Sequence, residues 1–279
     1  MIDTILEFIK QVGAKQLRLR REKGLDIGYK GVQPVTMVTK TDLEISRMFE
    51  AYAAEHFSDL DYFILDEESF GRYGSDVKTK MNNCEYLFVL DPLDGTLHYS
   101  QNIPLFGVSL GVFKKGKPYL GALYLPALGE LVYVNDKKEA YWVKNAFMEQ
   151  EHLIRLHEDF VSNSPLIVDL QRHFELDNSK NVKNYLFVDY LCSVFCYVLI
   201  ATGRVRSGMF KDWLWDMAGG WCIFRALGYK LYDVKAGKYL DELDTDDLTD
   251  DLKFKNAHII GKEDDIAYLK DIIIKDKGL

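Results

Sequence analysis

The sequence predicts an α+β fold, in which helices pack with a sizeable sheet. Three observations support this class. Hydrophobic residues make up 48% of the 279 positions, enough for one large domain or for two closely packed halves. Residues 2–22 carry apolar side chains at helical spacing. Residues 108–134 form short apolar segments separated by glycine-containing turns, the pattern of an antiparallel meander.

The N-terminal segment is predicted to contain two helices. The first covers residues 2–22 and should end at Lys23-Gly24. Residues 25–40 are polar and interrupted by glycine and proline, which is typical of a loop or short hairpin. Residues 41–44 have the form of a capping box and predict a second helix. Asp42 would lie in its first turn, where a carboxylate also complements the helix dipole.

Two predicted strands end in acidic residues. The apolar residues 62–65 are followed by an acidic segment, 66–69, and the apolar residues 86–90 are followed by residues 91–96, with two further aspartates. In open α/β sheets, ligands collect at the carboxyl ends of strands. The two strand ends therefore indicate one shared site. The alternative is that the acidic residues are simply exposed where each strand leaves the core.

Residues 91–96 combine two carboxylates and a hydroxyl on a constrained turn. Pro92 has no N–H to donate, so the strand should end there, and Gly95 permits a turn that a side chain would forbid. Mg²⁺ prefers carboxylate oxygens and keeps several waters. The stretch therefore favours a magnesium site, with an ordinary acidic Asp-Gly turn as the alternative.

The rest of the chain is predicted to complete two halves, residues 1–145 and residues 146–279. Residues 70–84 form a polar connection without a recognisable element. Apolar runs predict seven further strands and a buried helix at 191–201 that ends at Gly203. The strands are expected near 108–113, 119–125, 131–134, 166–168 and 205–210, with shorter ones at 141–143 and 185–190.

Two more helices are expected near the C-terminus. One opens at residue 213 and places Asp216 in its first turn. Its residues 218–220 are small, which is a poor choice for intrinsic helix stability and indicates that another element packs closely against them. The acidic run 241–251 is interpreted as a solvated loop, and residues 263–275 as a surface helix.

Composition excludes several classes of partner. The formal net charge is -8 and no basic stripe is present, so a nucleic-acid partner is not expected. The longest apolar stretch is shorter than the ~20 residues that a membrane span needs, and the N-terminus has no signal-peptide pattern. The cysteines have no zinc spacing and are expected to be reduced thiols, typical of a cytoplasmic protein. They are Cys84, Cys192, Cys196 and Cys222.

Four motifs, in order along residues 36–233, resemble those of the inositol monophosphatase family. Asp91-Pro92-Leu93-Asp94-Gly95-Thr96 resembles its signature Asp-Pro-(Ile/Leu)-Asp-Gly-Thr. Leu65-Asp66-Glu67-Glu68-Ser69 is similar to its strand-end Gly-Glu-Glu-Ser motif, with Asp66 in place of glycine. Trp215-Asp216-Met217-Ala218-Gly219-Gly220 is similar to its Trp-Asp-x-Ala-Ala-Gly motif. Val38-Thr39-Lys40-Thr41-Asp42 resembles its entry to the second helix.

The resemblance implies a layered α-β-α-β-α fold, shared by inositol monophosphatases and fructose-1,6-bisphosphatases, and a phosphomonoesterase that uses two or three Mg²⁺ ions. By carry-over, the first metal would be held by Glu67, Asp91 and the carbonyl of Leu93. The second would be held by Asp91, Asp94 and Asp216. A phosphate substrate would need such local positive charge on an acidic protein.

The resemblance also implies roles in catalysis and binding. Asp42 and Thr96 would orient and deprotonate the attacking water, and the N–H groups of Gly95 and Thr96 would receive the phosphate of a small substrate. Asp94 and Asp216 would contribute to substrate binding as well. Family members tend to be homodimers, and lithium often inhibits them.

The sequence departs from the family pattern near the substrate. A glutamate that usually precedes the Trp-Asp motif is missing, and Lys211 lies near its position. We hypothesise that the substrate carries a second anionic group, the alternative being that Lys211 is a surface lysine. Inositol monophosphate, phosphoadenosine phosphate, histidinol phosphate and fructose 1,6-bisphosphate are the substrates to consider. A binding or regulatory protein that keeps the fold without catalysis is the alternative from another class.

Overall fold

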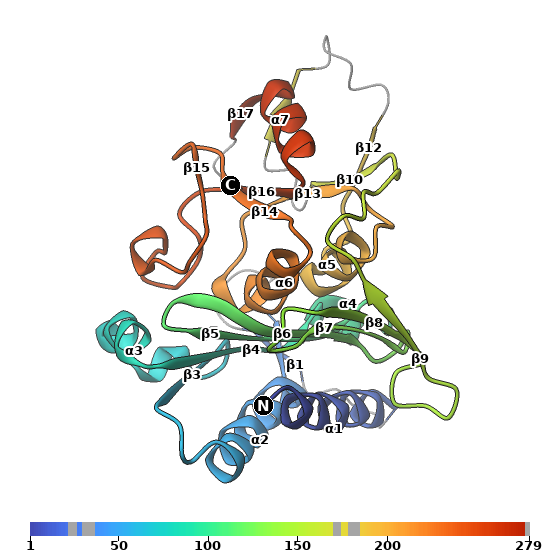
Figure 1. The fold of residues 1–279 in the computed structure, drawn as a ribbon. Coiled ribbons are helices and arrows are strands. Elements are labelled where there is room, and N and C mark those ends of the chain that lie inside the picture. The colour runs from blue at the N-terminus through green and yellow to red at the C-terminus, as the bar shows by residue number, and fades with distance from the viewer. Residues whose placement is uncertain (22–26, 30–36, 170–173, 178–184, 277–279) are drawn as a thin grey trace.

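Helices and sheets alternate in five layers (Figure 1). The computed structural model describes residues 1–21, 27–29, 37–169, 174–177 and 185–276. The first layer contains α1 (Ile2–Arg21) and α2 (Lys40–His56), and the central helical layer contains α5 (Ser193–Ala201) and α6 (Leu214–Ala226). The last layer is α7 (Glu263–Ile272). One sheet lies on each side of α5 and α6, which confirms the predicted α-β-α-β-α arrangement.

The first sheet has seven strands in the order β3-β4-β5-β6-β7-β8-β9. β3 pairs with β4 in parallel, and all later pairs are antiparallel, so the predicted meander is confirmed. The strands are β3 (Tyr62–Asp66), β4 (Tyr86–Asp94), β5 (Gly107–Lys114), β6 (Lys117–Leu125), β7 (Glu130–Val134), β8 (Ala140–Lys144) and β9 (His152–Leu156).

The second sheet has six strands in the order β12-β10-β13-β16-β14-β15. β10 runs parallel to both β12 and β13, whereas the other pairs are antiparallel. The strands are β10 (Leu166–Asp169), β12 (Leu186–Val188), β13 (Ser207–Phe210), β14 (Lys230–Asp233), β15 (Lys238–Tyr239) and β16 (His258–Gly261). The chain passes from the first sheet to the second between β9 and β10, and the division into halves at residue 145 stays a prediction.

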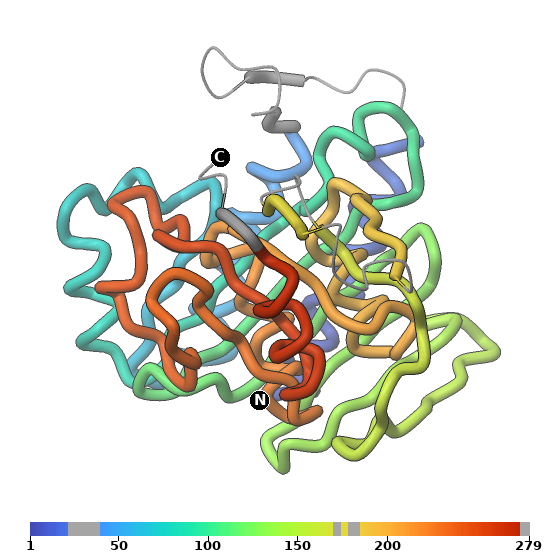
Figure 2. Tube along the Cα trace, turned by 90° about the horizontal axis from the view of Figure 1, so that it is seen from above, coloured from blue at the N-terminus to red at the C-terminus, as the bar shows by residue number. Residues whose placement is uncertain are grey.

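Two small antiparallel pairs complete the sheet structure. β1 (Ile27–Tyr29) pairs with β2 (Met37–Thr39), in agreement with the hairpin interpretation; residues 22–26 and 30–36 lie outside the described part. β11 (Phe174–Leu176) pairs with β17 (Ile273–Asp276), so the predicted C-terminal helix ends earlier than expected, at Ile272. Seen from above, α7 lies over the middle of the molecule (Figure 2).

Two sequence predictions about the first half are wrong. Residues 70–84 contain two short 3₁₀ turns, η1 (Phe70–Arg72) and η2 (Gly74–Asp76), and α3 (Val77–Asn83). The buried Val77 and Met81 give α3 an apolar face that the short, polar sequence conceals. β4 also does not end at Pro92.

β4 continues through Pro92 by means of a β-bulge. Asp91 pairs with Ser109 and Asp94 pairs with Gly107, so Pro92 and Leu93 together face a single residue of β5. A bulge removes the need for a ladder N–H, and proline is tolerated there for that reason. The strand consequently carries both aspartates of the motif within its last four residues.

Both faces of β4 are buried, as its apolar sequence predicts. Phe88 and Leu90 belong to the core beneath α1 and α2. Leu87 and Val89 belong to the core that includes α5 and α6. The strand end that carries the two aspartates is therefore held by packed side chains on both sides.

α6 packs closely on β5 and β6 because both surfaces carry small residues. A Cβ atom at Gly111 would lie 2.6 Å from the carbonyl oxygen of Ala218, and one at Gly121 would lie 2.4 Å from that of Gly219. This confirms the close contact predicted from residues 218–220. Among the helices that the structure describes, none is long and apolar enough to cross a membrane.

Replacing Gly111 by alanine should lower the free energy of unfolding by about 1–3 kcal/mol, because the new methyl group overlaps helix backbone that cannot rotate away. Urea denaturation measures the change. Gly71→Ala is the matched control, since a Cβ there meets no atom within 4 Å. Equal stability of the two variants would contradict the proposed close contact.

Candidate active site

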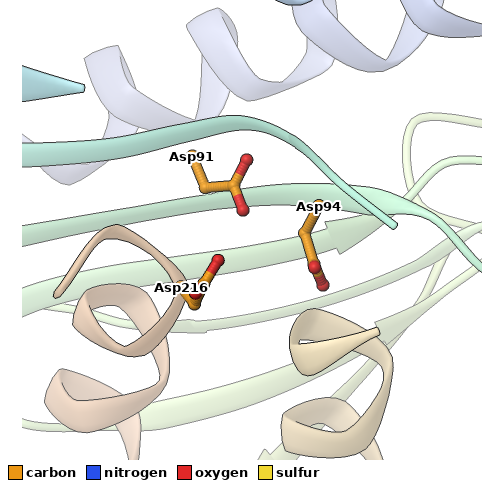
Figure 3. Close-up of side chains that lie close together, drawn as sticks. All are labelled: Asp91, Asp94 and Asp216. Carbon is orange, nitrogen blue, oxygen red and sulfur yellow. The ribbon is translucent and has the colours of Figure 1, made fainter. Parts of the chain in front are cut away.

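Three carboxyl groups converge between β4 and the first turn of α6 (Figure 3). They belong to Asp91 and Asp94, on either side of the bulge, and to Asp216. One oxygen from each lies within 4.8 Å of the others. The bulge places two carboxylates from one strand at this point, and the close packing of α6 brings the third.

All three carboxyl groups have raised pKa values. Removal from water raises the pKa of Asp91 well above its usual value, and the charges of Glu67, Asp94 and Asp216 raise it further. The pKa of Asp216 is raised well above its usual value for the same first reason, followed by the charge of Asp212. Burial also raises the pKa of Asp94. Three carboxyl groups this close together can all be ionised only if a positive charge compensates their repulsion.

The hydrogen bonds of Asp91 leave room for a cation. Its Oδ1 accepts the N–H of Leu93 at 3.0 Å. Its Oδ2 is buried and accepts no hydrogen bond from an N–H or O–H group among the residues that the structure describes, and the carboxyl lies within hydrogen-bond reach of that of Asp216. A buried charged oxygen without a partner is costly, and carboxylate oxygens are the ligands that Mg²⁺ prefers. The residues present therefore fit Mg²⁺.

The other two carboxylates are held by helix N-termini. Asp94 Oδ2 accepts hydrogen bonds from the N–H of Val194 at 2.5 Å and from the thiol of Cys192 at 3.0 Å, at the start of α5. Asp216 Oδ2 accepts the N–H of Trp213 at 3.1 Å. Asp216 is therefore both a helix cap, as its position in the first turn suggests, and a member of the cluster.

The turn after β4 has the glycine conformation that the sequence predicts. Gly95 has a φ of 78°, and a Cβ there would lie 2.5 Å from the carbonyl oxygen of Leu105. α4 (Thr96–Ser100) starts directly after it. The hydroxyl of Thr96 donates a hydrogen bond to the carbonyl oxygen of Leu93 at 3.0 Å.

Glu67 and Asp42 lie on elements next to the cluster. The charge of Glu67, just after β3, contributes to the raised pKa of Asp91 and of Asp216, although its carboxylate is outside the group of three. Asp42 is buried in the first turn of α2. The neighbouring Thr41 contacts the hydroxyl of Tyr99, in α4, at 3.3 Å. The helices that carry Asp42 and Thr96 therefore adjoin.

The sequence patterns do not predict the role of Gln16, which lies on α1 and supports the bulge. Its Nε2 donates hydrogen bonds to the carbonyl oxygens of Pro92, at 2.9 Å, and Gly107, at 3.3 Å. The bulge interrupts the ladder here, so these carbonyls need another donor. The signal was a glutamine four residues after the buried Val12, on the apolar face of the helix.

A second missed residue is Asp212, which follows β13. Its Oδ2 accepts hydrogen bonds from Ser193 at 3.1 Å and from Tyr197 at 2.5 Å, both on α5. Burial raises the pKa of this carboxyl to about 6. The adjacent Lys211 is half-buried. Asp212 fixes α5, which holds Asp94, relative to the start of α6.

Comparison with known proteins gives consistent results. A model of the inositol monophosphatase family matches residues 2–262. The fructose-1,6-bisphosphatase/inositol-1-monophosphatase of Thermotoga maritima is 26% identical over 200 residues, 71% of each chain. Inositol monophosphatase 2 of Saccharomyces cerevisiae is 25% identical over 227 residues, which cover 75% of this chain and 74% of the yeast protein.

Solved structures show the same fold. An IMPase/NADP phosphatase complexed with NADP and Ca²⁺ superimposes with a TM-score of 0.75 at 19% identity, and the match covers 99% of this chain and 95% of the other. The extragenic suppressor protein suhB of Bartonella henselae has a TM-score of 0.72 at 20% identity, with 97% and 96% covered.

Replacing Asp91 by asparagine should preserve the fold and remove stabilisation by Mg²⁺, because the variant lacks a buried charge that only a cation compensates. Thermal unfolding with and without Mg²⁺ measures this. When the Mg²⁺ concentration is about 100 times the dissociation constant, the free energy of unfolding of the wild-type protein should increase by about 2.7 kcal/mol. Asp136→Asn, at an exposed position, is the control and should keep the full gain. A gain in Asp91→Asn equal to that of the wild type would exclude Asp91 as a ligand.

Mg²⁺ binding should weaken as the pH falls. The carboxyls of Asp91, Asp94 and Asp216 have raised pKa values, so the folded metal-free protein binds protons that the unfolded chain releases above their usual pKa of 3.8. The contribution of these groups to the free energy of unfolding of the metal-free protein therefore declines as the pH rises. Metal binding, in contrast, needs the deprotonated carboxylates. Titration calorimetry between about pH 5 and pH 8 should show affinity that increases with pH, and proton release on binding. A flat profile would contradict this.

Proposed function

Because the chain belongs to the inositol monophosphatase family, and is therefore a phosphoric monoester hydrolase, we propose that it hydrolyses inositol monophosphate or a similar small phosphorylated metabolite with Mg²⁺ as cofactor. The observation that carries the proposal is the convergence of Asp91, Asp94 and Asp216 with oxygen atoms within 4.8 Å of one another. Three ionisable carboxyls on rigid elements are costly without a cation and suit hydrolysis that depends on one.

The proposed metal ligands are those that the family motifs indicate. Asp91, whose Oδ2 accepts no hydrogen bond from an N–H or O–H group in the described part of the chain, would be shared between two Mg²⁺ ions. Glu67 and the carbonyl of Leu93 would complete one site, and Asp94 and Asp216 the other. Bound Mg²⁺ would supply positive charge to the phosphate and increase the acidity of the attacking water.

The protein's own residues would position the water and the phosphate. The proton of the Thr96 hydroxyl is directed at the Leu93 carbonyl, which leaves the oxygen lone pairs of Thr96 available to accept a hydrogen bond from water. Asp42, as a carboxylate, would accept the proton that the water loses. The N–H groups of Gly95 and Thr96, at the first turn of α4, would bind the phosphate oxygens.

The names of the relatives and of one solved neighbour support three substrates, namely fructose 1,6-bisphosphate, inositol monophosphate and NADP. Fructose-1,6-bisphosphatase/inositol-1-monophosphatase is the name of a Thermotoga maritima relative, and one solved neighbour is a dual specific IMPase/NADP phosphatase bound with D-inositol-1-phosphate. We favour inositol monophosphate and keep fructose 1,6-bisphosphate as the second candidate. The half-buried Lys211 would favour a substrate with a second anionic group.

We further propose a cytoplasmic homodimer without nucleic-acid or membrane partners. The location is supported by four cysteines that are all free thiols, as a reducing compartment maintains them. The acidic net charge of -8 argues against a nucleic-acid partner. The dimer rests on the family resemblance.

Phosphate release from a panel of substrates, with and without Mg²⁺, tests the proposed function. The panel contains inositol 1-phosphate, fructose 1,6-bisphosphate, phosphoadenosine phosphate, histidinol phosphate and NADP. We expect turnover of at least one compound only with Mg²⁺, and none in the Asp91→Asn variant, because the shared ligand is lost. Lys211→Ala should reduce turnover of the bisphosphate-type compounds selectively. Absence of metal-dependent turnover across the panel would favour a non-catalytic binding protein on the same fold.

A further inference from the structure

Asp66 occupies the strand-end position where the family motif usually has glycine, and its side chain is 1% exposed. It is the last residue of β3 and directly precedes Glu67. Its Oδ1 accepts hydrogen bonds from the hydroxyl of Ser46 at 2.7 Å and from the N–H groups of Glu68 and Ser69 at 2.9 and 3.0 Å. Its Oδ2 accepts the hydroxyl of Ser69. A glycine could make none of these contacts.

The chemistry of the four contacts suits a side chain that only accepts hydrogen bonds. All four partners donate, and a carboxylate offers about four lone-pair sites with no proton of its own. Hydrogen bonds to a charged acceptor are stronger than those between neutral groups. Asp66 therefore holds the turn in place by accepting the backbone N–H groups of Glu68 and Ser69, which follow Glu67.

The contact with Ser46 connects this turn to α2. Ser46 lies four residues after Asp42 in the same helix, so both side chains are on the same helix face, and both are 1% exposed. The N–H of Glu67 also donates to the carbonyl oxygen of Leu90 on β4, at 3.4 Å. Through Asp66, the turn with Glu67 and the helix with Asp42 are joined directly.

We propose that Asp66 is a positioning residue that sets the orientation of Glu67 relative to Asp42. The inference rests on the proposed function, in which Glu67 binds Mg²⁺ and Asp42 acts on the attacking water. Residues that orient the ligands of a metal commonly affect its affinity about 10–100-fold when replaced. Asp66 would act through Glu67 and Asp42 without touching metal or substrate.

Asp233 provides a matched control within the same chain. It is the last residue of β14 and 2% exposed. Its carboxylate accepts the N–H of Ala236 at 2.7 Å and the side-chain amide of Asn256 at 2.9 Å. It therefore secures a strand-end turn in the same manner as Asp66. None of these partners belongs to the proposed site.

The experiment compares Asp66→Asn and Ser46→Ala with Asp233→Asn. Mg²⁺ binding to each purified full-length protein is measured by calorimetry with the metal alone, and kcat and KM are measured with the best substrate of the panel. We expect Asp66→Asn to weaken Mg²⁺ binding about 10–100-fold and to lower kcat at saturating Mg²⁺ with KM unchanged. Asp233→Asn should reduce thermal stability and leave both the affinity and kcat unchanged.

Ser46→Ala isolates the connection to α2, because it removes only one of the four contacts and keeps the turn. It should lower kcat in the same direction as Asp66→Asn, and the double variant should lose less than the sum of the two single variants, since both changes act on the contact between Asp66 and Ser46. Ser46→Ala also keeps the test valid if Asp66→Asn does not fold.

Two failures can be distinguished. A wild-type protein without Mg²⁺ binding or turnover would overturn the proposed function itself. A wild-type protein that binds Mg²⁺ and turns over, together with Asp66→Asn and Ser46→Ala variants that match it in affinity and kcat, would overturn only the role of Asp66. Equal loss of affinity in Asp66→Asn and Asp233→Asn would likewise show that the effect is general destabilisation.

Discussion

Repulsion among the clustered carboxylates of Asp91, Asp94 and Asp216 is the constraint on which the rest of this structure depends. Two like charges about 4 Å apart repel by about 4 kcal/mol at an effective dielectric constant of about 20, and the oxygens of Asp91, Asp94 and Asp216 lie within 4.8 Å of one another. The chain holds them together with packed cores on both faces of β4. The arrangement makes physical sense when a cation provides the missing charge, and it makes the metal-free protein less stable at neutral pH than packing alone would allow.

Three separate devices hold the carboxylates in place. The β-bulge directs Asp91 and Asp94 from one strand end, and Gln16 satisfies the carbonyl groups that the bulge leaves without ladder partners. The small residues between α6 and the first sheet bring Asp216 close. The first turn of α5 binds Asp94 through N–H and thiol donors. The devices draw on the first helical layer, the first sheet and the central helical layer, so the site depends on the packing of these three layers and would not survive in an isolated element.

Local sequence patterns predicted most helices, most strands and the acidic strand ends, because apolar periodicity and strand-end acids are properties of neighbouring residues. The grouping of Asp216 with Asp91 and Asp94 came from the resemblance to the family motifs. They could not predict the continuation of β4 beyond Pro92, since a bulge depends on the register of β5. α3 was missed because its buried face consists of only Val77 and Met81. The roles of Gln16 and Asp212 depend on contacts with residues distant in sequence, such as Pro92 and Tyr197, which local patterns do not contain.

In the proposed function, reaction chemistry and substrate choice would depend on different parts of this chain. The carboxylate cluster consists of Asp91 and Asp94 in the motif at 91–96 and Asp216 in the motif at 215–220. The surface beside it is formed by the start of α5 and the segment between β13 and α6, where the sequence has no motif. There Leu191 adopts a φ of 51° and is 53% exposed, and Asp212 joins the two segments through Ser193. The phosphate group of the proposed substrate would be recognised by charge and by N–H groups. The remainder of the substrate would be recognised by shape and by a few polar contacts, which these segments would supply, and the start of α5 has the additional role of binding Asp94.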